Sequence, residues 1–423
     1  MNIRITNRWL LYSLLLLILI IRFGIVFNSF HLLFLFTKLI FSNYSVALGQ
    51  IDFGLFDYFL SSVLIIILPA VILFKRKSFS FLDSSVSFAS FSAMILFISF
   101  VFAPLITNTN PEFQKNISVT KLLPPLSSVN AVYSLKNLEK TASYFILKEK
   151  VVKNSYNDRL VFADSIKKDS VITYYQKGRP YLLSSSVPFN LEKDYVITKK
   201  FFLLGTDEFG RDIFARLVYG ARISVSVGIL SILLTFILGS LLGFFAGYSG
   251  GIIDSFLSHI SEMFLSFPVI FLIILIIALF GNSIFSIIIV LGFSGWMSLF
   301  KIVRSEIIAL KGKDYFLTAK LLGVTNFNLI FSEMLPVISA SVIVNLIFQF
   351  GNVILAESAL SYLGLGTGSI YPSWGSMIQS GQSYITTAWW MILFPGLALF
   401  FTLFMTNSLG NIVKVMFNPR LKK

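Results

Sequence analysis

Apolar residues along this chain gather in runs long enough to cross a lipid bilayer, which takes about 20 residues of helix. The pattern predicts eight spanning helices, at about 9–27, 58–74, 86–106, 222–247, 264–281, 283–302, 337–356 and 388–412. Another apolar stretch, 32–41, is too short to span. It either lies in the membrane interface or extends the first helix.

Basic residues in the short loops predict how these spans are oriented, because Lys and Arg concentrate on the cytoplasmic side. They cluster before residue 9, at 75–77, within 301–336 and after residue 412. We therefore expect both termini to lie inside, and the loop 357–387, which has no Lys or Arg, to lie outside. Two segments do not follow the rule: the expected inside loop 248–263 has no basic residue, and Arg211, Arg216 and Arg222 fall outside.

Residues 107–204, between the third and fourth spans, have a different composition. They hold clusters of Lys, Asp, Asn and Ser, a Pro124-Pro125 break and the strand-like stretch Val171–Tyr175. The sequence predicts a small mixed α/β domain outside the membrane. Its basic character does not conflict with this side, since long loops translocate largely regardless of charge. The domain either docks a partner or only connects two spans.

Composition agrees with a membrane protein and excludes several kinds of chemistry. The 423 residues are 56% hydrophobic and only 13% charged, with a mean hydropathy of +0.82, whereas soluble domains are about a quarter charged. The net charge of +14 is better explained by cytoplasmic loops than by nucleic-acid binding. The chain has no cysteine and two histidines, His31 and His259, so we expect neither a metal site nor a cofactor.

The N-terminus resembles a signal peptide, with Arg4 and Arg8 before the apolar run Trp9–Phe27. However, the run is long, lacks a small-residue cleavage site and precedes further apolar sequence. We therefore expect a retained helix.

The segment Leu204–Asp212 reads LGTDEFGRD and is followed by Arg216, Tyr219-Gly220 and Arg222. We interpret it as a short amphipathic helix in which Asp207–Arg211 and Asp212–Arg216 are acid-before-base pairs. An interfacial anchor is favoured over a gate. The candidate residues of this lead-in are Gly205, Thr206, Asp207, Gly210, Arg211 and Asp212.

Small residues recur in the next span. Gly239 and Gly243 are four apart, which allows two helices to approach closely, and Gly247 follows at the same spacing. The stretch Ala246–Gly251 then breaks the helix as it leaves the membrane. We expect a tightly packed, hinge-capable core here.

Two further motifs lie nearer the C-terminus. The loop 301–336 carries Ala319 and Gly323, four apart, which on a helix would leave a notch for a partner. An amphipathic loop helix that binds no partner would show a similar pattern. Its candidate residues are Arg304, Lys311, Lys313, Tyr315, Ala319, Lys320, Gly323, Leu335 and Pro336. The second motif, ESALSYLGLG at 357–366 with PSWG at 372–375, supplies Glu357, Gly364, Gly366 and Trp374. A carboxylate beside apolar sequence is costly, so Glu357 is either functional or a cap for loop amides.

From Leu204 to the C-terminus, about half of the chain, these motifs in this order resemble the C-type permease subunits of bacterial oligopeptide and dipeptide ABC importers. In that family the third motif is a cytoplasmic coupling helix that docks on an ATPase, with a Glu-Ala-Ala, three residues, Gly pattern. Here the triplet is Leu317-Thr318-Ala319, followed by Gly323, and Glu333 stands where an Ile is expected. The fourth motif resembles the family's outward re-entrant loop.

The resemblance implies an all-α polytopic membrane protein of the type I ABC importer permease fold, with the mixed α/β domain inserted. The implied domains are 1–106 (three spans), 107–204 (extracytoplasmic), 205–221 (lead-in), 222–411 (permease) and 412–423 (cytoplasmic tail). Such a subunit moves its substrate by alternating access in the bacterial inner membrane. The implied partners are a second permease subunit in a heterodimer, two cytoplasmic ATPase subunits, an extracytoplasmic substrate-binding protein and membrane lipid, without nucleic acid.

No phosphate-binding Gly-Lys-Ser/Thr loop occurs in the chain, so we expect the subunit itself not to be an enzyme. Two alternatives stay open. A membrane-embedded transferase would use the cluster Asp254, His259 and Glu262, and an ion-coupled carrier would need charges in mid-span, where Arg22 is the clear example. The cargo stays open too: a peptide, a nickel complex or a sugar-like solute.

Overall fold

The structure is a computed structural model that describes residues 6–49, 53–107, 109–134, 144–151, 160–168, 172–182, 195–325, 328–366 and 372–417. The chain forms two compact units. Unit 1 comprises Met1–Ser87, Met94–Arg222 and Ser380–Pro395, and unit 2 comprises Phe88–Ala93, Ile223–Gln379 and Gly396–Lys423.

Seven helices in the described part of the chain are long and apolar enough to cross a membrane. They are α1 (Asn7–Ser42), α3 (Phe53–Phe74), α4 (Phe88–Ile106), α8 (Ile213–Ser249), α11 (Ile284–Lys311), α14 (Leu335–Tyr362) and α16 (Trp390–Phe417). The pair α9 (Gly251–Ser266) and α10 (Val269–Phe280) is bent by 92° and makes an eighth span if it is counted as one. The predicted fold class is thus confirmed, with one span broken.

Several predicted helix bounds were wrong. The stretch 32–41 extends α1, which confirms one of the two predicted alternatives for it, so the first span is longer than 9–27. The helix α16 continues through residue 417, into the predicted tail. The expected inside loop 248–263 is mostly the helix α9. The predicted break over Ala246–Gly251 is confirmed, because α8 ends at Ser249 and Gly250 has φ +68°. A second break lies at Phe267, whose extended backbone (φ −82°, ψ 130°) is the conformation favoured before a proline, here Pro268.

In unit 1, the helices α1, α3 and α4 share an apolar core that includes Leu15, Ile65 and Phe102. Pro104 lies inside α4, where its missing N–H leaves the carbonyl of Phe100 without its usual helical partner. Arg222 fills this gap, because its Nε donates to that carbonyl at 2.7 Å. Its guanidinium also pairs with Asp57 of α3 at 2.6 Å (Nη2–Oδ1).

The predicted mixed α/β domain is present in unit 1. Its elements are α5 (Ile117–Thr120), β1 (Ser127–Ser134), α6 (Tyr144–Val151), β2 (Leu160–Ala163), β3 (Ser165–Lys168), β4 (Ile172–Gln176), β5 (Arg179–Leu182) and β6 (Tyr195–Phe202). They form two antiparallel sheets with strand orders β2-β1-β6 and β3-β4-β5. The strand-like stretch Val171–Tyr175 corresponds to β4, except that Val171 lies outside the described residues.

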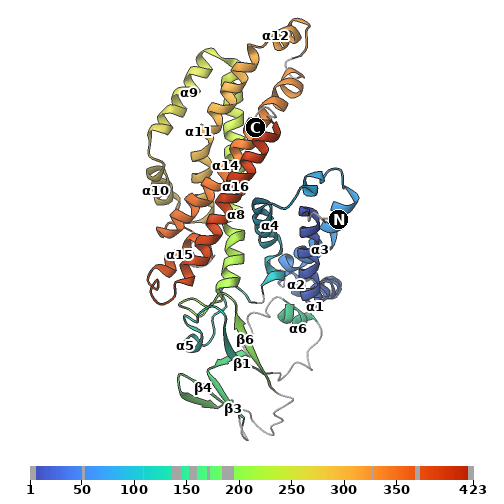
Figure 1. The fold of residues 1–423 in the computed structure, drawn as a ribbon, viewed down its shortest axis with the longest axis vertical. Coiled ribbons are helices and arrows are strands. Elements are labelled where there is room, and N and C mark those ends of the chain that lie inside the picture. The colour runs from blue at the N-terminus through green and yellow to red at the C-terminus, as the bar shows by residue number, and fades with distance from the viewer. Residues whose placement is uncertain are drawn as a thin grey trace. The chain divides into compact units, whose positions relative to one another are not determined.

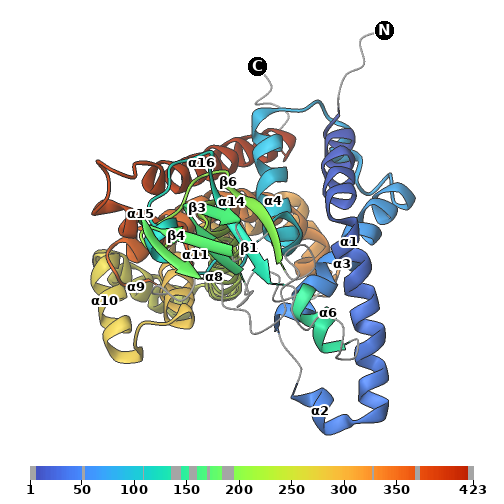
Figure 2. The same ribbon diagram turned by 90° about the horizontal axis from the view of Figure 1, so that it is seen from below.

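The first sheet is held by a small apolar core of its own. Ala131 of β1 pairs with Thr198 of β6 and Phe162 of β2. The rings of Phe162 and Phe202 pack at a tilt, with centroids 6.3 Å apart. The helix α6 packs beside α1 and α3, where Tyr144 shares a buried cluster with Leu32 (Figure 2).

In unit 2, α11 lies against both α8 and α14 along much of its length (Figure 1). The short helix α12 (Asp314–Leu321) follows α11, and a π-helical turn, η2 (Leu329–Met334), leads into α14. The helix α15 (Trp374–Gln382) follows the loop after α14.

Candidate functional site

The helices α8 and α11 are held together by glycines. Gly239, Gly243 and Gly247 lie four residues apart on α8, and a Cβ at each would come within 2.8–2.9 Å of α11 atoms, including backbone oxygens of Trp296, Phe300 and Arg304. That distance is shorter than any normal contact, so only glycine fits. The two helices therefore approach backbone to backbone, and we expect them to move as one body.

The ends of these helices are also tied by charged side chains. Lys311, at the end of α11, donates to the last carbonyls of α8: its Nζ lies 2.7 Å from Tyr248 O and 3.4 Å from Gly247 O. Such carbonyls have no helical partner of their own. Arg304 of α11 pairs with both carboxylate oxygens of Asp254 on α9. The three helices thus form one rigid base for α12.

The helix α12 is anchored on one side and exposed on the other. Phe316 is buried in a cluster with Leu310, Leu329 and Met334. Tyr315, Leu317 and Leu321 are exposed, and Leu321 is 88% exposed. Three apolar side chains, spread over nearly two turns of α12, are thus exposed beside the exposed Lys313.

The end of α12 depends on Gly323. Its φ is +77°, and a Cβ built there would meet nothing within 4 Å. The amide of Val324 donates to the carbonyl of Ala319 at 3.2 Å, the hydrogen bond that closes a helix on a left-handed glycine. Gly323 thus follows the helix, so it does not form the predicted notch with Ala319, which is partly buried on α12.

The remaining candidates of this loop lie at the start of α14 or outside the described side chains. Pro336 occupies the first turn of α14, where a proline costs no hydrogen bond. Leu335 beside it is exposed. The backbone of Lys320 belongs to α12, but its side chain is not among those described.

The segment 205–212 is not the predicted short helix. It forms turns, and α8 begins at Ile213 and continues without interruption to Ser249. Gly205 (φ +80°) and Gly210 (φ +73°) adopt left-handed backbone conformations, and a Cβ at Gly205 would lie 2.5 Å from Leu123 O. Only the part of the predicted lead-in after residue 212 is helical, and it belongs to α8.

A buried charge network holds these turns. Asp207 accepts from the Nε of Arg211 at 2.6 Å and from its backbone amide at 2.8 Å. Glu112 accepts from both Arg211 (2.8 Å) and Arg216 (2.6 Å). Arg211 also lies 4.0 Å from Glu208, so two arginines are paired with three carboxylates. The predicted pair Asp212–Arg216 was wrong, because Asp212 instead accepts from Thr109 at 3.1 Å.

Thr206 links the turns to two other segments of unit 1. Its hydroxyl donates to Thr120 O and accepts from the amide of Leu123 at 2.8 Å. Its carbonyl accepts from Nε1 of Trp390, at the start of α16, at 3.1 Å. The lead-in motif is therefore the place where the inserted domain is fixed to the helices of unit 1.

Burial shifts three titratable groups near these turns. It raises the pKa of Glu208 and of Asp212, and it lowers the pKa of Lys200. Lys200 and Asp212 partly offset each other's shift, because opposite charges favour each other's ionised form.

Glu357 lies fully buried inside α14. Its carboxylate accepts from the hydroxyls of Ser224 (2.9 Å), Ser361 (2.8 Å) and Ser358 (3.4 Å). Ser224 belongs to α8, so this cluster joins α8 and α14 through a carboxylate. The expected re-entrant loop begins after Tyr362, not at Glu357.

The loop after α14 folds back on the same helix. Gly364 has φ +80°, and a Cβ at Gly366 would collide with Ser361. Trp374 opens α15 and is 2% exposed. A Cβ at the following residue, Gly375, would collide with the backbone of Ser358, so α15 is pressed against the last turns of α14.

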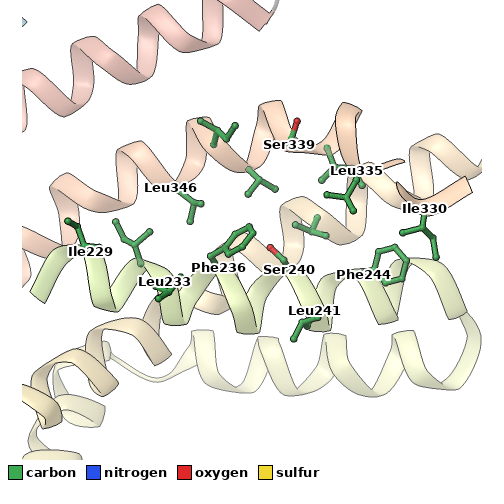
Figure 3. Close-up of a pocket in the computed structure, with 15 residues that line it drawn as sticks. Ile229, Leu233, Phe236, Ser240, Leu241, Phe244, Ile330, Leu335, Ser339 and Leu346 are labelled. Carbon is green, nitrogen blue, oxygen red and sulfur yellow. The ribbon is translucent and has the colours of Figure 1, made fainter. Parts of the chain in front are cut away.

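Unit 2 has an apolar cavity of about 800 Å³ between α8 and α14. Figure 3 shows Phe236 of α8 and Leu346 of α14 pointing into it. Ser240 and Ser339 supply the polar atoms in view. The cluster Asp254, His259 and Glu262 does not line this cavity. Asp254 pairs with Arg304, Nδ1 of His259 lies 2.6 Å from Ser255 O, and Glu262 lines a separate pocket of about 450 Å³ beside Arg304.

Comparisons with known proteins support the family resemblance that these motifs indicated. The family model for the binding-protein-dependent transport system inner membrane component matches residues 239–423. The dipeptide transport system permease protein DppC of Alkalihalophilus pseudofirmus is 38% identical over 218 residues, which cover 52% of this chain and 72% of that protein. The chain belongs to this family of transport permeases.

Two further proteins are similar to parts of the chain. The oligopeptide transport system permease protein OppC of Haemophilus influenzae is 34% identical to this permease over 220 residues, which cover 52% of this chain and 71% of that protein. The MetNI methionine ABC transporter, in an inward-facing conformation, gives a TM-score of 0.40 at 15% identity, over 48% of this chain and 97% of that chain.

Sequence reasoning missed three residues that the structure places in the permease's contacts. Glu112 holds two arginines about 100 positions away, and no sequence signal marks it. Asp57 pairs with Arg222; an acid at the start of an apolar run was a signal for it. Glu306 lies inside α11, past the predicted end of that span at 302, and the continuing helical pattern to Lys311 could have revealed it.

Proposed function

We propose that this permease is the transmembrane subunit of an ATP-driven, binding-protein-dependent importer of peptides. The observation that carries the coupling part of the proposal is α12: a helix on a rigid base, ended by Gly323, with Tyr315, Leu317 and Leu321 exposed. Exposed apolar side chains that lie together beside an exposed lysine are typical of a surface that a protein partner covers. The peptide cargo rests on the named relatives, which are dipeptide and oligopeptide permeases.

The proposal includes the rest of the assembly. A second permease forms a heterodimer with this one, and two cytoplasmic ATPase subunits hydrolyse ATP. Both termini and α12 lie on the cytoplasmic side, as the basic residues of the short loops favour. Closure of the ATPases would push α12 and move α11 together with α8, so that the central path opens alternately to each side.

The inserted domain would receive the substrate-binding protein outside the membrane. Its β3-β4-β5 sheet offers an exposed edge: every residue of β5 is exposed, and Tyr181 stacks on Tyr174 with ring centroids 5.4 Å apart. Such an aromatic, two-sided surface is typical of protein contacts.

Two matched substitutions test the coupling role. Leu321→Asp changes an exposed leucine of α12, and Leu182→Asp changes an exposed leucine of β5 (69% exposed). Both proteins should insert and accumulate normally. We expect Leu321→Asp to lose co-purification with the ATPases and at least tenfold of the peptide uptake, while Leu182→Asp keeps the ATPases. Normal ATPase binding and uptake by Leu321→Asp would remove α12 as the coupling element.

A further inference from the structure

The helix α14 carries three amide side chains along one side. Asn345, Gln349 and Asn352 follow each other at spacings of four and three residues, which place them on one face. Asn352 is exposed, and the other two are half-buried. They occupy the middle of a 28-residue helix that is otherwise largely apolar. Amides are costly in hydrocarbon unless they are hydrogen-bonded.

Polar groups of α11 adjoin the same side. The Nε2 of Gln349 donates to Gly295 O of α11 at 3.3 Å and to Oδ1 of Asn345 at 3.0 Å. Eight residues earlier on α14, the hydroxyl of Ser341 donates to Oε1 of Glu306 at 2.7 Å. We call Ser341, Asn345, Gln349, Asn352 and Glu306 the polar seam. From residue 341 to 352 it rises roughly 16 Å, about half of the hydrocarbon thickness.

Helix packing alone does not account for the polar seam. The bond from Gln349 to Gly295 is an ordinary link between spans. Its Oε1, however, is buried without a partner, and Asn352 is exposed. Among the described residues, Glu306 makes no ion pair with a Lys or Arg. These groups need water or a polar ligand, since charged and polar side chains within spans usually face an aqueous path.

The other sides of α14 are apolar. Leu346 and Ile343 line the cavity toward α8, and Ile343 is 41% exposed. The polar seam is therefore confined to one side of the helix, which is expected if that side binds a polar ligand.

We propose that the polar seam lines the translocation path and binds the backbone of a passing peptide. This rests on the proposed import of peptides. A side-chain amide both donates and accepts hydrogen bonds, so Asn345 and Asn352 can match a peptide bond whatever the cargo's side chains are. Glu306, at the basic end of α11, attracts the ammonium group of the cargo. Gln349 holds Asn345 in place.

The absence of cysteine from the chain makes thiol labelling a clean test. Asn352→Cys is compared with Ile343→Cys, nine residues earlier on the opposite face of the same helix, in the full transporter with its binding protein in vesicles. We expect a charged, membrane-impermeant methanethiosulfonate to modify Asn352→Cys at least tenfold faster than Ile343→Cys. Dialanine should slow the reaction at position 352. Equal rates at both positions, or a rate that dialanine does not change, would overturn the proposal.

A second measurement tests Glu306. The wild type should import dialanine in preference to N-acetyl-dialanine, which lacks the ammonium group, and Glu306→Gln should reduce that preference at least fivefold. An unchanged preference in Glu306→Gln would exclude the carboxylate from recognition. Dialanine uptake by the wild type, measured in the same vesicles, tests the proposed function separately: if it is absent while Asn352→Cys still reacts rapidly, the peptide cargo is wrong but the path is aqueous.

Discussion

At the scale of single residues, Gly323 has a backbone conformation that favours glycine and lies next to the surface proposed to bind the ATPase. Its left-handed φ of +77° costs a non-glycine residue roughly 1–2 kcal/mol, yet the space around it is open. Loss of function on substitution therefore has two possible sources: backbone strain, and damage to the surface that the ATPase would cover.

Asparagine and aspartate separate these two sources, since both tolerate the left-handed conformation and have the same shape. We expect Gly323→Asn to retain most ATPase binding and uptake. Gly323→Asp should insert and accumulate normally but lose both together, because an unpaired charge would be buried in the contact. Co-purification and uptake are the measurements. Equal behaviour of the two variants would show that no partner covers this turn.

Asp212 offers a pH-dependent test in the lead-in. Burial raises its pKa in the folded protein, so the folded state holds a proton more tightly than the unfolded chain does. Stability from this group is therefore greatest at low pH and declines as pH rises through the folded pKa. Asp212→Asn removes the charge and keeps the cap on the amide of Phe214 (2.9 Å). We expect Asp212→Asn to be more thermostable than wild type at pH 8.

The control for this prediction is Asp212→Ala, which removes both charge and cap and should cost about 1 kcal/mol relative to Asp212→Asn. Thermal unfolding in detergent at pH 5 and pH 8 is the measurement. The advantage of Asp212→Asn should shrink at pH 5. An advantage that grows on acidification would contradict the assignment.

At the scale of elements, the pairing of α8 with α11 decides how force could pass from α12 into the membrane. Three glycines bring the backbones together, and Lys311 ties the last carbonyls of α8 to the end of α11. Such a pair has no room to slide by small amounts, because interdigitated packing is not continuously deformable. It transmits motion as a unit.

Gly243→Val should weaken this pair, since its Cβ would lie 2.8 Å from Phe300 O and 2.9 Å from the Cβ of Val303. Overpacking of this kind costs about 1–3 kcal/mol. The control is Gly24→Ala in α1, where a Cβ meets nothing within 4 Å, and a mid-helix glycine replaced by alanine gains about 0.5–1 kcal/mol. Midpoints of thermal unfolding should fall for the first and hold or rise for the second. A Gly243→Val protein as stable as wild type would show that the helices lie farther apart.

At the scale of the whole molecule, the N-terminal helices α1 and α3 pack against segments that come later in the chain. The helices α1 and α3 precede the region that matches the family, 239–423. They nonetheless share a core with α4, and Asp57 of α3 pairs with Arg222 of α8 within unit 1.

Thiol labelling also tests the proposed orientation. Leu182→Cys, in the inserted domain, should react with an impermeant reagent in cells whose outer barrier is opened. Lys313→Cys, beside α12, should react only after the inner membrane is breached. The native chain has no cysteine, so it serves as the blank. The reverse pattern would invert the orientation and place α12 outside.

Most of the membrane architecture could be predicted from the sequence, because the bilayer sets a length for each apolar run. The wrong predictions concern the ends and breaks of helices, which the thickness of the bilayer does not determine. The segment expected as the loop 248–263 is mostly the helix α9, which Pro268 separates from α10, and α8 begins nine residues earlier than its apolar run suggested. Helix ends depend on caps and on neighbouring segments, which hydropathy does not measure.

For the candidate sites, the sequence determined which residues are special but only the tertiary structure decided what each contacts. Glycine spacing indicated close packing, and the fold supplied α11 as the partner. Acid and base patterning predicted Asp207–Arg211 correctly, yet Arg216 pairs with Glu112, far away in sequence. Local patterns are fixed by the period of a helix and the thickness of a bilayer, so they can be read from order alone. Contacts between distant segments depend on how the chain returns on itself, and only the folded structure determines that.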